Sequence, residues 1–311
     1  MISSDLHEAI RLLRAGQLVG IPTETVYGLA ANALDPLAVA RIFEAKNRPA
    51  FDPLIVHVGQ RAELPYLVTS IPDEAQVLMD AFWPGPLTLV LPKSDIIPDI
   101  VTSGLPHVAL RMPKHPLAQR LLQSLPFPLA APSANPFGYV SPTTAQHVMD
   151  QLASKVSCIL DGGPCQVGLE STVIGFADGR AVILRQGGVS QEDIESAVGR
   201  PVSSQTSQSR PAAPGQLDSH YAPHRTIQLL EHGGRPTKLA LGETWISYLP
   251  KPDAFEALAP DGQVATAAHR LFSLLRKIDQ QPGGVVWIEK APESGLGRAV
   301  NDRLMRAAHR A

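Results

Sequence analysis

One stretch near the N-terminus, residues 18–58, constrains the fold more than any other part of the chain. Residues 18–21 predict a short buried strand, because they form an apolar run that ends at a proline. Asp35 and Pro36 then mark a helix start, a capping residue followed by a first-turn proline. Residues 54–58 predict a second strand that is apolar on both faces except at His57. This strand–helix–strand unit favours an α/β sheet, and open sheets of that class bind ligands beyond their strand ends.

Polar and cationic side chains follow each element of this unit. Thr25 and Tyr27 offer hydroxyls just beyond the first strand. Lys46 lies on the inward face of the last helical turn, and Arg48 precedes a proline that favours extended backbone, so both cations can point to one place. Two such cations suggest an anion site. The alternative is that Lys46 and Arg48 form a solvated helix end and that His57 is a buried core histidine.

Later strand ends and turns carry more side chains of the same kinds. They are Arg111, Ser133, Asn135, Ser141, Ser171 and Arg185. Arg111 ends a predicted strand over residues 107–111, where it would bind an anion or form a structural ion pair. Ser133 and Asn135 lie two residues apart, so they share one side of an extended chain and suit a ribose or a phosphate. Ser141 predicts the cap of a further helix, whose N-terminus can also receive an anion.

The charge and cysteine content exclude several classes of protein. A net charge of −2 argues against binding to nucleic acid or membrane through a general surplus of positive charge, so any anion site must be local. Cys158 and Cys165 are too few for a disulfide framework and lack partners at zinc spacing. No apolar run has the length of a signal core or a membrane span. We therefore expect a cytoplasmic protein without membrane contact and without a protein-held metal.

The length of 311 residues suits two domains of unequal size. Residues 1–201 predict a mixed sheet with helices, since strands alternate with helices but several strand pairs are joined by short turns. A linker is expected over residues 202–225, because residues 201–214 are rich in Ser, Gln, Pro and Ala. Residues 226–311 predict a small three-layer α/β domain with three apolar strands.

Familiar nucleotide, zinc and hydrolase motifs do not explain the chemistry. The sequence contains no GxxxxGK[ST], GxGxxG, HExxH or GxSxG. Several cations and hydroxyls without an obvious nucleophile favour transfer chemistry on a phosphate, in which catalysis is mostly positioning and neutralisation of charge.

An ordered series of motifs extends over nearly the whole chain. It comprises PTETVYGLA, the K-x-R of Lys46 and Arg48, PLIVH, FWPGPLTLVL, the S-x-N of Ser133 and Asn135, ESTV, HYAP and GLGRAVNDRL. In these motifs the chain resembles the threonylcarbamoyl-AMP synthases, specifically the long, two-domain form of the YrdC-like family. Two positions depart from that pattern: Asn47 stands where the family usually has Gly, and Asp52 where Asn is common.

The resemblance implies a YrdC-like twisted mixed sheet and a nucleotidyltransferase activity. L-threonine, bicarbonate or carbon dioxide, and ATP would give L-threonylcarbamoyl-adenylate and pyrophosphate. A separate complex would use the adenylate to modify the adenosine next to the tRNA anticodon. Mg²⁺ would be held mainly through the ATP phosphates, with few direct protein ligands. The resemblance leaves open whether this chain itself contacts tRNA.

The resemblance also implies roles for the residues in the matching motifs. Lys46 and Arg48 would be catalytic. The nucleotide would be held by Lys46, Arg48, Ser133, Asn135, Ser141, Arg185, His220 and Tyr221. Threonine would be held by Thr25, Tyr27, His57, Arg111 and Ser171, with Arg111 facing its carboxylate. His220 and Tyr221 would cover the cleft as a lid; alternatively they only join the two domains.

Two other functions fit parts of the sequence. One is O-carbamoylation through carbamoyl-adenylate, which usually brings further segments such as acylphosphatase domains or zinc fingers that are absent from this sequence. The other is an RNA-binding or ribosome-associated module without catalysis. The net charge of −2 and the apolar setting of His57 and Arg111 count against that module.

Overall fold

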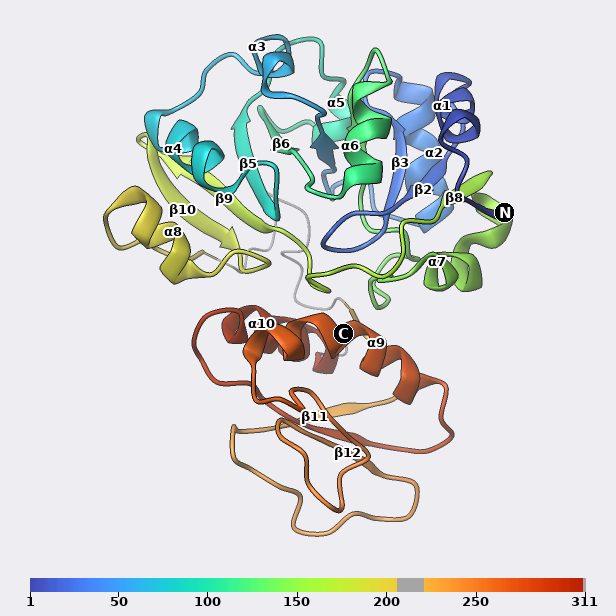
Figure 1. Cartoon of the computed structure of the whole chain (residues 1–311), viewed down its shortest axis with the longest axis vertical. Helices are drawn as coiled ribbons and strands as arrows, with labels where there is room; N and C mark the ends of the chain where they lie inside the picture. The colour runs from blue at the N-terminus through green and yellow to red at the C-terminus, as the bar shows by residue number, and fades with distance from the viewer. Residues whose placement is uncertain (206–220, 310–311) are drawn as a thin grey trace.

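The computed structural model describes residues 1–205 and 221–309 and contains two sheets (Figure 1). The larger sheet has ten strands in the order β1-β8-β2-β3-β7-β4-β6-β5-β9-β10. Its strands are β1 (Ile2–Ser3), β2 (Val19–Ile21), β3 (Gly28–Asn32), β4 (Ile55–His57), β5 (Leu87–Pro92), β6 (His107–Arg111), β7 (Leu129–Ala130), β8 (Cys158–Leu160), β9 (Thr172–Ala177) and β10 (Arg180–Arg185). The helices of this domain are α1 (Leu6–Arg14), α2 (Pro36–Lys46), α3 (Leu64–Leu67), α4 (Asp73–Phe82), α5 (Asp99–Thr102), α6 (Pro116–Gln123), α7 (Ala145–Leu152) and α8 (Gln191–Val198), with single 3₁₀ turns at Arg61–Glu63 and Ala153–Lys155.

The strand directions confirm the predicted mixed sheet. Strand β4 runs parallel to β6, whereas β5 runs antiparallel to β6 and parallel to β9. Strands β9 and β10 form an antiparallel pair. The carboxyl ends of β4, β6 and β10 and the amino end of β9 therefore meet at one edge of the sheet.

The predicted helix start at Asp35 is confirmed, because the Asp35 carboxylate accepts hydrogen bonds from the amides of Leu37 and Ala38. The helix ends at Lys46, and Asn47 follows with a left-handed backbone at φ 51°. Glycine and asparagine are the residues that adopt this conformation at least cost. Asn47, where the family usually has Gly, is thus suited to the left-handed backbone that ends this helix.

The predicted cap at Ser141 is wrong. Helix α7 begins at Ala145, and its cap is Thr144, whose hydroxyl accepts a hydrogen bond from the amide of His147. Ser141 precedes Pro142 and instead donates its hydroxyl to the carboxylate of Glu170, at 2.6 Å. The Ser141 hydroxyl therefore binds a carboxylate that is distant in the sequence, and it does not cap the helix as the local sequence predicted.

The second sheet is fully parallel and has the order β11-β14-β12-β13. Its elements are β11 (Ile227–Leu230), β12 (Thr244–Ser247), β13 (Glu256–Ala257), α9 (Val264–Asp279), β14 (Val286–Glu289) and α10 (Gly297–Ala308). Three of these strands match the apolar strands expected from the sequence. Figure 1 shows α9 and α10 together on the side of this sheet that faces the larger domain. The described residues thus form two layers here, which differs from the three-layer arrangement expected.

The two domains share an apolar contact layer. Val26, Val140 and Leu169 of the larger domain belong to the same buried cluster as Phe272 of α9 and Val300 of α10. Burial of this apolar surface stabilises the contact between the domains. The residues that follow β2, β7 and β8 in the larger domain are therefore packed directly against the helices of the smaller one.

Candidate active site

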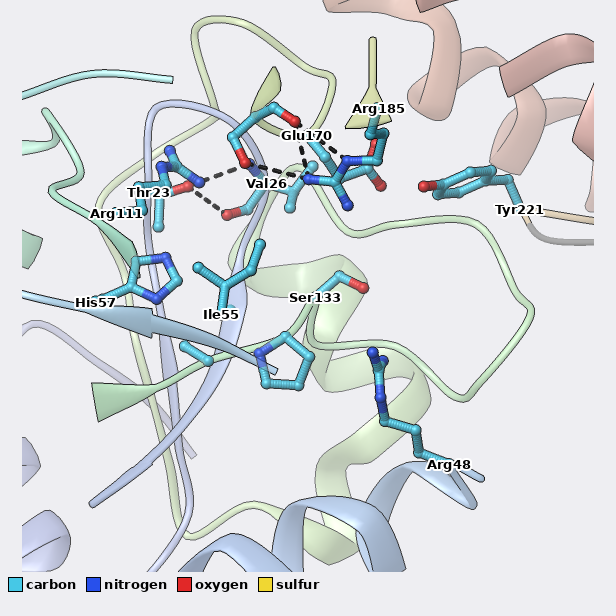
Figure 2. Close-up of a pocket in the computed structure, with 14 residues that line it drawn as sticks. Thr23, Val26, Arg48, Ile55, His57, Arg111, Ser133, Glu170, Arg185 and Tyr221 are labelled. Carbon is cyan, nitrogen blue, oxygen red and sulfur yellow. Dashed lines mark hydrogen bonds between the residues drawn. The ribbon is translucent and has the colours of Figure 1, made fainter. Parts of the chain in front are cut away.

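A cavity lies in the larger domain, and Figure 2 shows the residues that line it, with Tyr221 near the helices of the smaller domain. It holds about 50 Å³ that the centre of a water-sized sphere can reach; the 550 Å³ of non-atom space around it includes open solvent. Its lining residues are Thr23, Val26, Gly28, Arg48, Ile55, His57, Arg111, Ala131, Pro132, Ser133, Glu170, Ser171, Arg185 and Tyr221. Ile55 and His57 are two residues apart on β4, so their side chains point from the same face of the sheet. The cavity gathers arginines from three separate parts of the chain.

His57 and Arg111 are neighbours in register on the parallel strands β4 and β6. His57 is 3% exposed, and its Nδ1 has no hydrogen-bond partner within the part of the chain that the structure describes. Burial, followed by the charge of Arg111, lowers the pKa of His57 to about 3. His57 is therefore neutral at neutral pH and leaves a buried polar atom available to a ligand.

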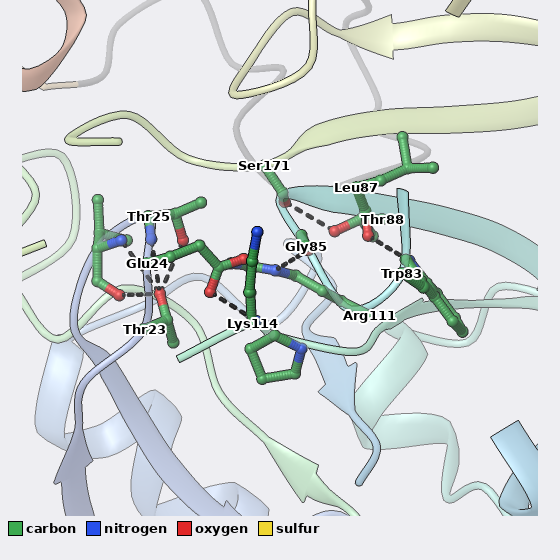
Figure 3. A network of polar contacts seen from close by, with 12 residues as sticks. Thr23, Glu24, Thr25, Trp83, Gly85, Leu87, Thr88, Arg111, Lys114 and Ser171 are labelled. Carbon is green, nitrogen blue, oxygen red and sulfur yellow. Dashed lines mark hydrogen bonds and ion pairs between the residues drawn. The ribbon is translucent and has the colours of Figure 1, made fainter. Parts of the chain in front are cut away.

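Arg111 is paired with an acid that the sequence interpretation did not assign (Figure 3). Its guanidinium lies 2.7 Å from Oε1 of Glu24, and each side chain is only 4% exposed. The other carboxylate oxygen of Glu24 accepts the amide of Lys114 at 2.9 Å. The structural ion pair foreseen as an alternative for Arg111 is thus present, although Arg111 also lines the cavity.

Arg48 is likewise compensated by a buried acid. Its guanidinium lies 2.8 Å from Oδ2 of Asp52 and also donates to the carbonyls of Asp52 and Pro53. Asp52 itself is fully buried. The departure from the family's usual Asn at position 52 therefore supplies a negative charge that offsets Arg48 where burial would penalise the guanidinium.

Lys46 does not line the cavity. Its ammonium donates to the carbonyl oxygens of Ser133 and Asn135, each at 2.5 Å, and the residue is 1% exposed. Burial and the nearby Arg48 hold the pKa of Lys46 well below its usual range. In this structure Lys46 fixes the backbone that presents Ser133, whose side chain lines the cavity.

Ser171 and Arg185 form the opposite wall. The Arg185 guanidinium donates to the carbonyl of Ser171 at 2.9 Å and to its hydroxyl at 3.1 Å. The Ser171 hydroxyl also lies 2.7 Å from the hydroxyl of Thr88 on β5. The bulge near the end of β10 sets Arg185 opposite Val173, next to the start of β9.

Glu170 is the one carboxylate among the described residues that line the cavity. Its Oε1 accepts the hydroxyl of Ser141, and its Oε2 lies 2.9 Å from Nε of Arg303 on α10. Burial alone would raise the pKa of Glu170, but the charges of Arg303 and Arg185 outweigh burial and lower it. Glu170 is therefore ionised, and its oxygens are already engaged.

Besides Lys46, four of the predicted site residues in the described part of the chain lie outside the cavity lining. Thr25 contacts the hydroxyl of Thr23, and the Tyr27 hydroxyl donates to the carbonyl of Gly163. The Asn135 amide donates to the carbonyls of Pro136 and Tyr139, and Ser141 is bound to Glu170. These side chains hold loops around the site in this structure, whereas the predicted roles placed them on substrate.

Tyr221 lines the cavity, as its predicted nucleotide role requires, and its partner His220 lies outside the described residues. Sequence reasoning missed Glu24, Glu170 and Arg303 as members of the site. All three stand inside the motifs PTETVYGLA, ESTV and GLGRAVNDRL. The available signal for Glu24 and Glu170 was that each is a charged residue among small or apolar neighbours, where burial demands a partner. Arg303 follows Asn301 and Asp302, so its motif gave no such signal.

The fold and the cavity belong to a class of protein that two family models identify. The Sua5/YciO/YrdC family model, described as "Telomere recombination", matches residues 11–187, which include every strand of the larger sheet from β2 to β10. A second model, described as "Threonylcarbamoyl-AMP synthase, C-terminal domain", matches residues 189–309.

Full-length relatives narrow this class. The threonylcarbamoyl-AMP synthase of Pyrococcus abyssi is 42% identical, with 96% of this chain and 93% of the relative covered. The Bacillus subtilis enzyme of the same name is 40% identical, with 97% and 92% covered. A crystal structure of P. abyssi Sua5 complexed with L-threonine superimposes with a TM-score of 0.90 at 40% identity, over 97% of this chain and 94% of that one. The chain belongs to the threonylcarbamoyl-AMP synthase family, in its two-domain form.

Proposed function

We propose that this chain is an L-threonylcarbamoyladenylate synthase, a nucleotidyltransferase that condenses L-threonine, bicarbonate or carbon dioxide, and ATP. The observation that carries the proposal is the match of both domains to enzymes of that name, 42% identical in the P. abyssi case. The cavity supports it, because three arginines face a narrow space that also offers hydroxyls and a neutral histidine. The alternatives of a carbamoyl-adenylate former and of an RNA-binding module account for neither full-length match.

The reaction would proceed in two bond-forming steps. The threonine amine adds to carbon dioxide and loses a proton to form a carbamate. A carbamate oxygen then attacks the α-phosphorus of ATP, and the bond to the β-phosphate oxygen breaks to release pyrophosphate. Both the carbamate and the mixed anhydride decompose in water, so a cavity that excludes water favours product accumulation.

The cavity residues divide between the two substrates. Arg48 and Arg185 would neutralise phosphate charge, and Ser133 would donate its hydroxyl to the nucleotide. Arg111 would bind the threonine carboxylate while it remains paired with Glu24, and Ser171 would hold the same substrate. His57 would donate or accept a hydrogen bond as a neutral imidazole; its pKa of about 3 makes it a weak base. Lys46 would act through the backbone at Ser133.

Mg²⁺ would come to the site on ATP. Across residues 1–205 and 221–309, no cluster of three or more His, Cys, Asp or Glu side chains could hold a metal ion. Glu170 is already bound to Ser141 and Arg303. The donors present therefore fit an ion carried by the phosphates better than a protein cage.

Delivery of the product to a separate tRNA-modifying complex is part of the proposal, as is a cytoplasmic location. Within the described residues, the structure contains no helix long and apolar enough to cross a membrane.

The test is amino-acid-dependent pyrophosphate release. The protein is incubated with ATP, bicarbonate and each amino acid in turn, and release is expected with threonine. Arg48→Ala should abolish it. Asp52→Asn is the matched control, because it breaks the same buried ion pair but keeps the guanidinium, and it should lose much less activity. Equal release with and without threonine would refute the proposed function.

A further inference from the structure

Helix α10 of the smaller domain carries an arginine that none of the predicted roles uses. Arg303 is fully buried, and α10 lies on the side of its sheet that faces the larger domain (Figure 1). A buried arginine is costly unless acceptors surround it, so its contacts show what the side chain is for.

Two of these contacts reach the larger domain at the cavity. Nε of Arg303 lies 2.9 Å from Oε2 of Glu170, and a terminal nitrogen donates to the carbonyl of Gln186 at 2.8 Å. Glu170 lines the cavity, and Gln186 directly follows Arg185, which also lines it. The remaining terminal nitrogen binds Asp302 within α10. The planar guanidinium thus ties helix α10 to two points on one wall of the cavity.

A third contact involves Tyr221. The guanidinium carbon of Arg303 lies 5.2 Å from the centre of the Tyr221 ring, within cation–π range. Phe272 of α9 stacks on the same ring, with 5.4 Å between centres and 26° between planes. Figure 2 shows the Tyr221 hydroxyl directed into the site toward Arg185. Both helices of the smaller domain therefore orient a ring that lines the cavity.

We propose that Arg303 is a positioning residue of the active site, supplied by the smaller domain, which holds Glu170 and Tyr221 in the geometry that accepts the nucleotide. The inference rests on the proposed function. Glu170 is close enough to Arg185 that each charge affects the other. With Arg303 in place, one carboxylate oxygen of Glu170 is engaged by α10 and does not turn toward Arg185. Without Arg303, Glu170 turns to the cavity arginine and competes with ATP.

The competing explanation is that Arg303 only joins the two domains. The same helix offers a more exposed comparison for it: Arg298, whose side chain is 32% exposed, joins α10 to Glu192 of α8 at 2.6 Å. Neither Arg298 nor Glu192 lines the cavity. If Arg303 serves only domain contact, its replacement can lower stability, but the folded variant should bind ATP and turn over as the Arg298 variant does.

The experiment compares Arg303→Gln, Arg303→Lys and Arg298→Gln in the full chain. Threonine-dependent pyrophosphate release and ATP binding by calorimetry are both measured. For Arg303→Gln we expect kcat/KM to fall by about tenfold or more and the ATP dissociation constant to rise by about fivefold or more. Arg303→Lys should lose less activity than Arg303→Gln, because lysine keeps the positive charge but lacks the planar set of donors of a guanidinium. Arg298→Gln should change each value by less than about twofold.

A double-mutant cycle tests whether Arg303 acts through Glu170 or only stabilises the contact between the domains. If Arg303 acts through Glu170, Arg303→Gln combined with Glu170→Gln should lose no more activity than the worse single variant. Arg298→Gln combined with Glu170→Gln should multiply the two losses. Equal effects at Arg303 and Arg298, or multiplied losses at Arg303 and Glu170, would overturn the inference. If Arg303→Gln does not fold, Arg303→Lys is judged by the same criteria.

Calorimetry keeps the two proposals apart. A wild-type protein that binds ATP but shows no threonine-dependent release of pyrophosphate would refute the proposed function. The difference in ATP affinity between the Arg303 and Arg298 variants would still decide the role of Arg303.

Discussion

The buried neutral His57 gives this protein a defined source of acid sensitivity. The unfolded chain binds a proton at His57 with the ordinary pKa of 6.5, whereas the folded protein does so only at about 3. Between these values the unfolded state carries more protons, so the free energy of unfolding falls as the pH drops below 6.5 and the loss levels off below about 3. The cause is burial: His57 is 3% exposed and stands beside Arg111.

The size of the effect follows from linkage. At pH 5 the unfolded histidine is almost fully protonated and the folded one is neutral, which costs about 2 kcal/mol relative to pH 7. At pH 4 the cost grows to about 3 kcal/mol. Other groups also titrate over this range, so the measured quantity is the difference between wild type and a variant without the histidine.

Urea denaturation of wild type and His57→Gln at pH 7 and pH 5 measures that difference. Wild type should lose about 2 kcal/mol more than His57→Gln between the two pH values, because the variant has no imidazole to protonate. His107→Gln, at an exposed histidine that begins β6, is the control and should follow wild type. The same pH dependence in wild type and His57→Gln would show that His57 is not held neutral by burial.

Two further predictions concern contacts seen only in the folded chain. Glu24→Ala should lower the free energy of unfolding by about 3 kcal/mol or more, because it leaves the guanidinium of Arg111 buried without its acid. Urea denaturation measures this loss. The control is Asp80→Asn, which breaks the exposed pair with Arg61 and should leave stability unchanged. A result in which the two variants behave alike would contradict the buried pairing. Gly168→Ala should destabilise the contact between domains, because an added Cβ would lie 2.5 Å from backbone atoms of His269 on α9. Gly179→Ala is its matched control, since Gly179 has a similar φ of +77° but open space around it. The clash is measured by how much more stability Gly168→Ala loses in urea denaturation than Gly179→Ala does. Equal losses of stability in the two variants would count against the packed contact.

Local sequence predicted the elements whose causes are local. The cap at Asp35, the helix end at Lys46 and the strand that carries His57 each depend on neighbouring residues and on hydrophobic period, and the structure confirms them. The family resemblance supplied the YrdC-like fold. The placement of Ser141 failed because its hydroxyl binds Glu170, 29 residues further along the chain.

The candidate site was predicted as a set of residue types, and only partly as a set of contacts. His57, Arg48, Arg111, Ser133, Ser171, Arg185 and Tyr221 do line one cavity. Lys46, Thr25, Tyr27, Asn135 and Ser141 carry polar groups that the sequence assigned to substrate and that the structure shows bound to other parts of the chain. Sequence spacing gives the direction of a side chain along its own element, but not the acceptor that another element brings to it.

By itself, the sequence determined that this chain would form a mixed α/β domain with a local, cation-rich anion site, because hydrophobic period, capping residues and net charge are properties of neighbouring residues. Only the tertiary structure decided which cations are compensated, with Asp52 beside Arg48, Glu24 beside Arg111 and Glu170 beside Arg303. Each of these acids is buried, and a buried charge must find its partner wherever the fold places one. For Arg303 that partner lies in the other domain, 133 residues away in the sequence.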